Sequence, residues 1–111
     1  MRAMAAPHPV CVIGAGLSGL TTVKHLADRG IAHRCFEMGS DLGGNWRYDN
    51  DNGRSPAYAS LHIDTSKERF AFADLPMDKS FPVYPHHTQV LAYLERYADE
   101  FGLRESISLV R

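Results

Sequence analysis

The sequence predicts an α/β protein with a parallel sheet, and three features of its first third carry that prediction. A short apolar run over residues 9–13 is typical of a strand buried on both faces. Three glycines follow within six positions, and behind them apolar residues recur at helical spacing. A second apolar run then ends in an acidic residue. Strand, tight turn, helix and strand in this order form a βαβ unit with parallel strands and a right-handed crossover.

The elements of this unit can be placed along the chain. We expect a strand over residues 9–13, a helix over residues 17–29 and a second strand over residues 31–37. The apolar face of the helix consists of Leu20, Val23, Leu26 and Ala27. Gly30 supplies the C-terminal cap, since glycine adopts the left-handed conformation that ends helices.

The rest of the chain is less regular. Residues 40–56 are rich in glycine and polar residues and predict a long loop, in which DNDNG at residues 49–53 forms a turn and not a calcium site. Residues 61–74 show no clean period. We expect a helix from its cap at Thr88 to Phe101, ended by Gly102, and a third strand over residues 106–110.

Composition limits the class of protein. A length of 111 residues fits one small domain, and a net charge of −1 gives no field that would attract nucleic acid. No run reaches the length of a membrane span, so we expect a cytoplasmic chain. Residues 1–8 are expected to be a flexible terminus and residues 9–111 an incomplete domain. Cys11 and Cys35 fall in expected strands, where buried thiols are commoner than disulfides.

The glycine turn VIGAGLSGL has the spacing of a dinucleotide-binding motif. Gly14 permits the sharp turn, Gly16 lets a pyrophosphate approach, and Gly19 lets the helix pack closely on the strand. Glu37 closes the second strand, where its carboxylate can accept hydrogen bonds from a ribose and repel a 2′-phosphate. This combination favours NAD or FAD over NADP at this site. The alternative is a glycine turn used only for packing, with Glu37 as a surface carboxylate.

Three longer stretches resemble the N-terminal part of flavin-containing monooxygenases: FEMGSDLGGNWRY, LHIDTSKERFAFADLPM and FPVYPHHTQVLAYLERYADEFGL. The likeness extends from about residue 9 to residue 111. Amine oxidases share the glycine turn and the diglycine but typically continue GGR, whereas Asn45 and Trp46 follow Gly44 here. The resemblance implies a partial, apparently truncated Rossmann-like fold: a doubly wound parallel sheet that binds FAD and, in the full-length enzyme, NADPH.

The resemblance also implies which residues meet the cofactor. Around the pyrophosphate they are Gly14, Ala15, Gly16, Leu17, Ser18 and Gly19; on the ribose, Glu37; along the cofactor, Gly44, Asn45 and Trp46; beside the flavin and nicotinamide, Ile63, Asp64 and Thr65. Asp64 is the candidate catalytic residue. The family usually carries Asn in this string, and an ionised carboxylate offers only acceptors, so we expect weaker stabilisation of the oxygenated flavin and more leakage to hydrogen peroxide.

The activity implied is oxygenation of a soft nucleophile, an amine or a sulfide, by dioxygen through a flavin C4a-hydroperoxide after reduction by NADPH. The segment alone is not expected to complete a cycle, and the remainder of the enzyme or a second chain is an expected partner. Two other readings stay open: a non-catalytic nucleotide-binding or interaction module, and a fragment of an NAD-dependent dehydrogenase. No metal site is expected, and His86 and His87 are assigned to helix entry.

Overall fold

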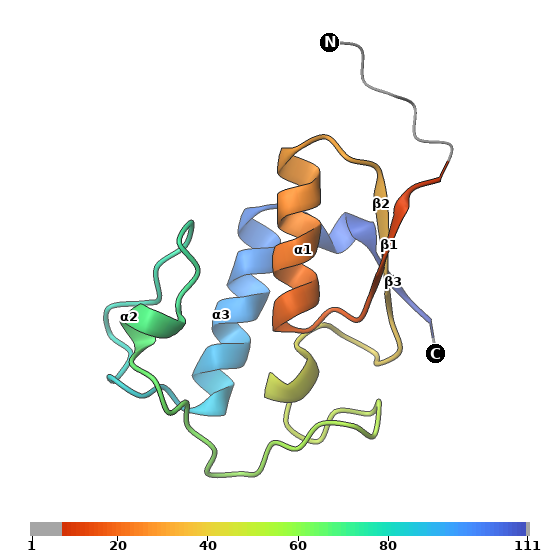
Figure 1. Cartoon of the computed structure of the whole chain (residues 1–111). Helices are drawn as coiled ribbons and strands as arrows, with labels where there is room; N and C mark the ends of the chain where they lie inside the picture. Colours follow the sequence, from red (N-terminus) through yellow and green to blue (C-terminus); the bar gives the residue numbers. More distant parts are fainter. Residues whose placement is uncertain (1–7, 111) are drawn as a thin grey trace.

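The computed structural model describes residues 8–110 and shows three parallel strands with two longer helices on one side (Figure 1). The strands are β1 (Val10–Ile13), β2 (His33–Glu37) and β3 (Ile107–Leu109); the helices are α1 (Leu17–Asp28), α2 (Lys67–Phe70) and α3 (His87–Glu100), with short 3-10 turns η1 (Gly44–Trp46) and η2 (Leu103–Ser106). The expected flexible terminus, residues 1–8, lies outside the described residues except for its last position.

The sheet has the order β1-β2-β3, and both pairings are parallel. Val12 of β1 lies opposite Cys35 of β2, which lies opposite Ile107 of β3. The βαβ unit predicted from the sequence is therefore confirmed, with β2 beginning two residues later than expected. Helix α1 packs on the sheet and α3 packs beside α1 (Figure 1).

The core lies between the strands and these two helices. Inward-facing Val12 and Cys35 meet the apolar face of α1, and α3 closes the other side with Tyr93, Leu94, Tyr97 and Ala98, all nearly or fully buried. Burial of large apolar side chains at about 1.5–3 kcal/mol each is the main stabilising contribution here. The helix expected before Gly102 is confirmed, and this packing shows which of its faces is buried.

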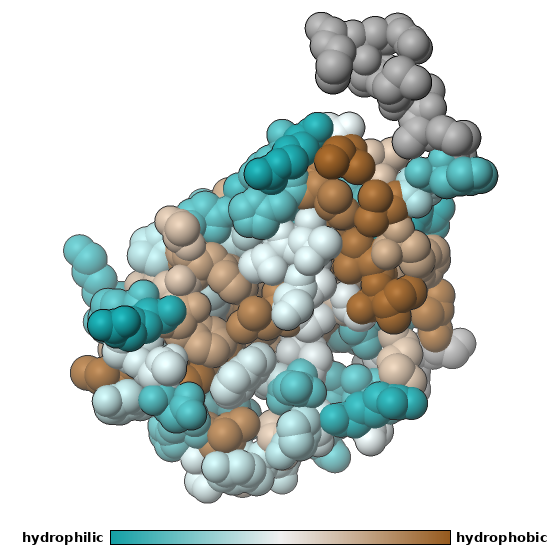
Figure 2. Space-filling view, viewed as in Figure 1, coloured by the Kyte–Doolittle hydropathy of each residue, from teal (hydrophilic) through white to brown (hydrophobic). Residues whose placement is uncertain are grey.

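The opposite face of the sheet is open in residues 8–110. Ile13 is 80% exposed, and Figure 2 shows hydrophobic surface over the strands. This corrects two expectations. The first strand was expected to be buried on both faces, but β1 is largely exposed, with only Val12 buried. Cys11 is exposed, because its side chain points away from α1, while Cys35 is buried as expected. Burial, helped by the charge of Glu37, raises the pKa of the Cys35 thiol to about 11.

The N-cap of helix α3 lies two residues earlier than expected. It is His86 and not Thr88: the His86 ring accepts from the Thr88 amide, and the Gln89 side chain accepts from the His86 amide, which completes a capping box. The helix-entry role of the adjacent histidines is confirmed. Gly102, at φ +63°, follows the last turn as predicted.

The segment between the loop and α3 contains α2 and short bridges only. His62 pairs with His86 and Phe72 with Leu75, so the missing period in residues 61–74 reflects the absence of a longer element there. Over the described range, none of the helices is both long enough and apolar enough to cross a membrane.

Candidate functional site

A sharp backbone corner joins β1 to α1. Gly14 has φ +95°, which L side chains rarely adopt, and its amide donates to the Phe36 carbonyl at 2.8 Å. Gly16 is the N-cap of α1, and within residues 8–110 no side chain caps it. The first amides of α1 therefore have no helical acceptor, and the positive end of the helix dipole offers them to an anion.

Gly19 is required for the packing of α1 on this corner. A Cβ atom at position 19 would lie 1.9 Å from the carbonyl oxygen of Gly14, far inside any tolerable contact. The oxygen belongs to the backbone of Gly14, and the Cβ would be fixed to the backbone of α1, so neither can give way cheaply. The geometry supports the role that the spacing of the motif predicted for Gly19.

A second pair of glycines lies directly against the corner. The Gly43 amide donates to the Ala15 carbonyl at 2.9 Å, and a Cβ atom on Gly44 would lie 2.9 Å from the Cα atom of Gly16. Both glycines have positive φ, +119° and +54°. The loop after β2 and the turn after β1 thus meet backbone to backbone, which is why position 44 has no room for a side chain.

Corner and loop together line a cavity of about 280 Å³. Its lining residues are Ile13, Gly14, Gly16, Leu17, Ser18, Gly19, Gly44, Asn45 and Trp46. Eight of these nine were predicted to contact the cofactor; the structure brings those eight together. A larger cavity of about 600 Å³ lies between α2 and the loop after it, lined by Lys67, Phe72 and Met77 among others, and contains none of the predicted site residues.

Glu37 is buried, with 3% of its surface exposed. One carboxylate oxygen accepts from the Ala15 amide at 2.8 Å and the other from the Gly39 amide at 2.6 Å. The side chain therefore joins the glycine corner to the loop after β2. Each oxygen keeps a lone pair for a further donor, which leaves the ribose contact chemically open.

The last three predicted residues lie apart from this cavity. Ile63 is buried, whereas Asp64 and Thr65 are exposed, and none of them lines it. The Ile63 amide donates to the Pro85 carbonyl at 3.1 Å, which fixes the segment against the residues before α3. Trp46 connects the cavity to α2, because its ring meets Phe70 of that helix edge-on at 5.7 Å.

Sequence reasoning missed two residues that shape the site, Asn50 and Arg47. Asn50 is buried, and its side-chain Nδ2 donates to the Gly44 carbonyl at 3.0 Å. It belongs to the predicted turn, which is confirmed by a hydrogen bond from the Gly53 amide to the Asn50 carbonyl. Only its turn-forming residue type could have drawn attention to it, because its partner is set by the folded loop.

Two further observations concern metals and histidines. Within residues 8–110, no group of three or more His, Cys, Asp or Glu side chains is arranged to hold a metal ion. His86 and His87 instead both direct a ring nitrogen at the Ala59 carbonyl, at 2.7 and 3.1 Å. The rings of His62 and His86 also stack edge-on.

Comparison with known proteins places these features in a family. The model of the flavin-binding monooxygenase-like family matches residues 8–110. Flavin-containing monooxygenase 5 of Oryctolagus cuniculus is 46% identical over 100 residues, and its Homo sapiens counterpart is 41% identical. Each alignment covers 88% of this chain but 19% of the relative. The chain thus spans about a fifth of the length of these relatives.

Solved structures agree with this result. S-allyl-L-cysteine S-oxygenase from Allium sativum superposes with a TM-score of 0.79 at 31% identity, over 90% of this chain and 27% of that one. A steroid monooxygenase bound to NADP gives a TM-score of 0.75 at 28% identity, over 91% and 19%. Both findings are consistent with the predicted cofactors, FAD and NADPH, and with a Rossmann-like fold. The chain belongs to the flavin-binding monooxygenase-like family.

Proposed function

We propose that the chain is the FAD-binding portion of an NADPH-using monooxygenase and that the glycine corner receives the FAD diphosphate. The observation that carries the proposal is the uncapped N-terminus of α1, which shares one cavity with Gly44 and Asn45. Free amides and a helix dipole suit a diphosphate, and the bare backbone allows its close approach. Glu37, held at the end of β2, would accept from the adenosine ribose.

The residues of this chain would bind and orient the cofactor. The amides of Leu17 and Ser18 would donate to phosphate oxygens, and Trp46 would cover one side of the cofactor while it packs on Phe70. Asp64 and Thr65 would lie near the flavin, as the family resemblance implies. FAD, when bound, supplies the chemistry that activates dioxygen.

Substrate choice would lie outside these residues. The superposable structures include both an S-oxygenase and a cyclohexanone monooxygenase, so the same segment occurs in proteins named for different substrates. We propose an amine or sulfide as the substrate of the complete enzyme. Because the chain spans about a fifth of its relatives, we expect it to bind FAD without completing a catalytic cycle.

Fluorescence of Trp46 offers a direct test, since it is the only tryptophan in the chain and lines the cavity. Titration with FAD should quench its emission with saturation, and the purified protein should show a flavin absorption band. Quenching by NAD without any response to FAD would favour a dehydrogenase fragment. Absence of both responses would contradict nucleotide binding.

A Gly16→Ala variant separates ligand binding from folding. The added Cβ would approach no heavy atom of the protein closer than 3.5 Å, and the φ of −82° suits any residue. The methyl group would instead occupy the cavity, so the dissociation constant for FAD should rise about tenfold. Ser60→Ala, at an exposed position that does not line the cavity, is the control. Equal affinities of Gly16→Ala and the parent chain would refute this placement.

A further inference from the structure

The diglycine loop, defined here as residues 41–47, needs a further restraint to stay against the glycine corner. Its two central glycines have positive φ, and glycine loses more conformational freedom on folding than other residues. One backbone hydrogen bond, from the Gly43 amide to the Ala15 carbonyl, joins it to the corner. The net contribution of a single bond of this kind is comparable with the entropic cost of ordering one residue.

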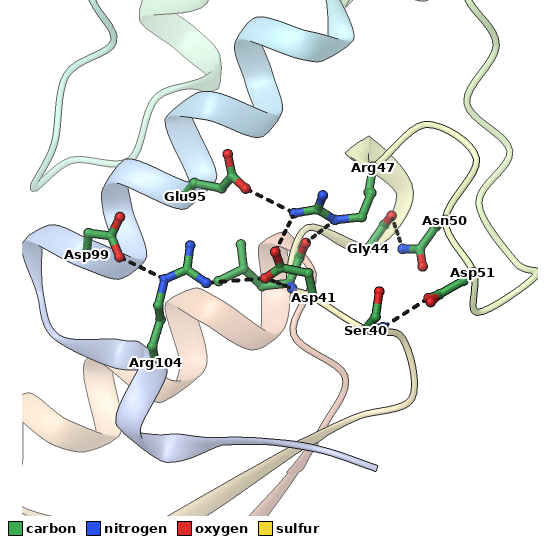
Figure 3. A network of polar contacts seen from close by, with 10 residues as sticks. Ser40, Asp41, Gly44, Arg47, Asn50, Asp51, Glu95, Asp99 and Arg104 are labelled. Atoms are coloured by element: carbon green, nitrogen blue, oxygen red, sulfur yellow. Dashed lines mark hydrogen bonds and ion pairs between the residues drawn. The ribbon is translucent and has the colours of Figure 1, made fainter. Parts of the chain in front are cut away.

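Arg47 supplies that restraint from inside the loop (Figure 3). Its Nε donates to the Leu42 carbonyl at 2.8 Å, directly before the two glycines. One terminal nitrogen donates to Glu95 of α3 at 3.0 Å and lies 3.3 Å from Asp41. The guanidinium therefore closes the loop on itself and ties it to α3. A planar fork of fixed donors suits this task, whereas a lysine could not serve all three acceptors in these directions.

A second arginine extends the network to the end of α3. Arg104 of η2 lies 3.2 Å from the other Asp41 oxygen and 2.8 Å from Asp99 (Figure 3). Positive and negative groups thus alternate from Glu95 through Arg47, Asp41 and Arg104 to Asp99. The Arg47 side chain is 23% exposed and that of Arg104 is 44% exposed, so solvent screens the outer pair more strongly.

Packing of the loop against α3 also restrains it. A Cβ atom on Gly43 would lie 2.5 Å from Leu91 of α3, so the helix lies directly behind the glycine that bonds to the corner. The loop is therefore held between the corner and α3, with Arg47 at its end. Side chains of Asn50 and Ser55 hold the carbonyls of Gly44 and Asn45, so release of Arg47 would loosen this wall of the cavity without freeing it completely.

We propose that Arg47 is a positioning residue for FAD binding: through Leu42, Asp41 and Glu95 it holds the diglycine loop against the glycine corner and couples the cofactor site to α3. The inference rests on the proposed FAD site. Arg47 itself does not line the cavity, so its effect on FAD would pass through the loop.

The test is the dissociation constant for FAD of the 111-residue chain and its variants, measured by quenching of Trp46. Arg47→Met should raise it about tenfold, and Arg47→Lys, which keeps the charge and one donor, should recover part of that loss. Arg104→Met should raise it about twofold. Arg29→Met is the matched control and should have no effect, because within residues 8–110 the side chain of that arginine donates only to the His25 carbonyl of α1.

Amide hydrogen exchange distinguishes positioning from general destabilisation. In the ligand-free Arg47→Met chain, exchange at the Gly43 amide should accelerate about tenfold while the core amides of α3, such as that of Leu94, keep their protection. Uniform acceleration of all amides, or FAD affinity equal to that of the parent, would overturn the inference. If Arg47→Met does not fold, Arg47→Lys and Glu95→Gln decide by the same two measurements. A parent chain that fails to bind FAD, with Gly43 still released in the variant, would refute the FAD site and retain the loop restraint.

Discussion

The glycine corner and the segment over residues 61–86 are held in place by different kinds of contact. The corner is built largely from backbone: a Cβ on Gly19 would meet the Gly14 carbonyl, and a Cβ on Gly44 would meet the Cα atom of Gly16. The later segment has backbone hydrogen bonds too, such as that from the Ile63 amide to the Pro85 carbonyl, but side chains that reach main-chain carbonyls also hold it. Lys67 Nζ, for example, donates to the carbonyls of Lys79 and Phe81.

This difference explains what a sequence can reveal. Backbone contacts demand glycine, and glycine at fixed spacing is visible in the sequence as a motif. Side-chain contacts to distant carbonyls accept many residue types and depend on how the chain has already folded. The comparison predicts that substitutions which add atoms lower the stability of the corner. Substitutions which remove side-chain atoms should lower the stability of the later segment.

The largest effect is expected for Gly19→Ala. Alanine would improve helix propensity by about 1 kcal/mol, but the Cβ would meet the Gly14 carbonyl oxygen at 1.9 Å. We expect a net loss of about 3 kcal/mol in the free energy of unfolding, measured by urea denaturation. Gly16→Ala is the control, since its φ of −82° suits alanine and its Cβ would meet no heavy atom closer than 3.5 Å. Equal stability of the two variants would remove the steric account of the corner.

Removal of one oxygen should weaken the later segment. The Tyr93 hydroxyl donates to the Leu75 carbonyl at 2.5 Å and accepts from the Phe72 amide at 2.9 Å. Tyr93→Phe would leave both partners without this hydrogen bond and should lower the free energy of unfolding by about 2 kcal/mol. Tyr58→Phe, at an exposed ring, should change it little. If both variants match the parent in urea denaturation, side-chain anchoring of this segment is wrong.

These two positions also show the limits of prediction. The βαβ unit, the glycine turn and α3 could be predicted because periodicity and glycine spacing are local properties. Tyr93 could be assigned to the core from the sequence only as one more apolar position, because its hydroxyl partners lie about twenty residues away. The roles of Arg47 and Asn50 were missed for the same reason, and the exposure of Cys11 depends on which face of the sheet is covered.

An ion pair between α1 and the later segment should make a third, smaller contribution to stability, and this contribution should be lost in acid. Lys24 of α1 lies 2.8 Å from Asp74, and its hydrogen bond holds the pKa of the Asp74 carboxyl below its ordinary value. A lowered pKa in the folded state adds stability above the unfolded pKa, near about 3.9, that is lost as the pH falls through the folded value.

Asp74→Asn should therefore flatten the fall in unfolding free energy below about pH 4, measured by urea titrations at a series of pH values. Glu100→Gln, at an exposed carboxylate at the end of α3, should leave the slope unchanged. Parallel curves for Asp74→Asn and the parent would show that the ion pair does not anchor this segment to α1.

The smallest effect is expected at Asp64, which is exposed in this chain. In a complete monooxygenase carrying residues 8–110 of this chain in place of its own matching segment, Asp64→Asn should lower hydrogen peroxide release per NADPH roughly twofold. The amide restores a donor that an ionised carboxylate lacks. Thr65→Ser in the same hybrid is the comparison variant for a conservative change nearby. Unchanged coupling between NADPH and product would refute this expectation.

The most direct test of the account is a map of backbone amide shifts in the 111-residue chain as FAD is added. The account predicts saturable shifts at Gly14, Gly16, Leu17 and Ser18 and at Gly44, Asn45 and Trp46. Little change is expected at the C-terminal end of α1. Saturable shifts confined to other residues, or none at the glycine corner at millimolar FAD, would contradict it.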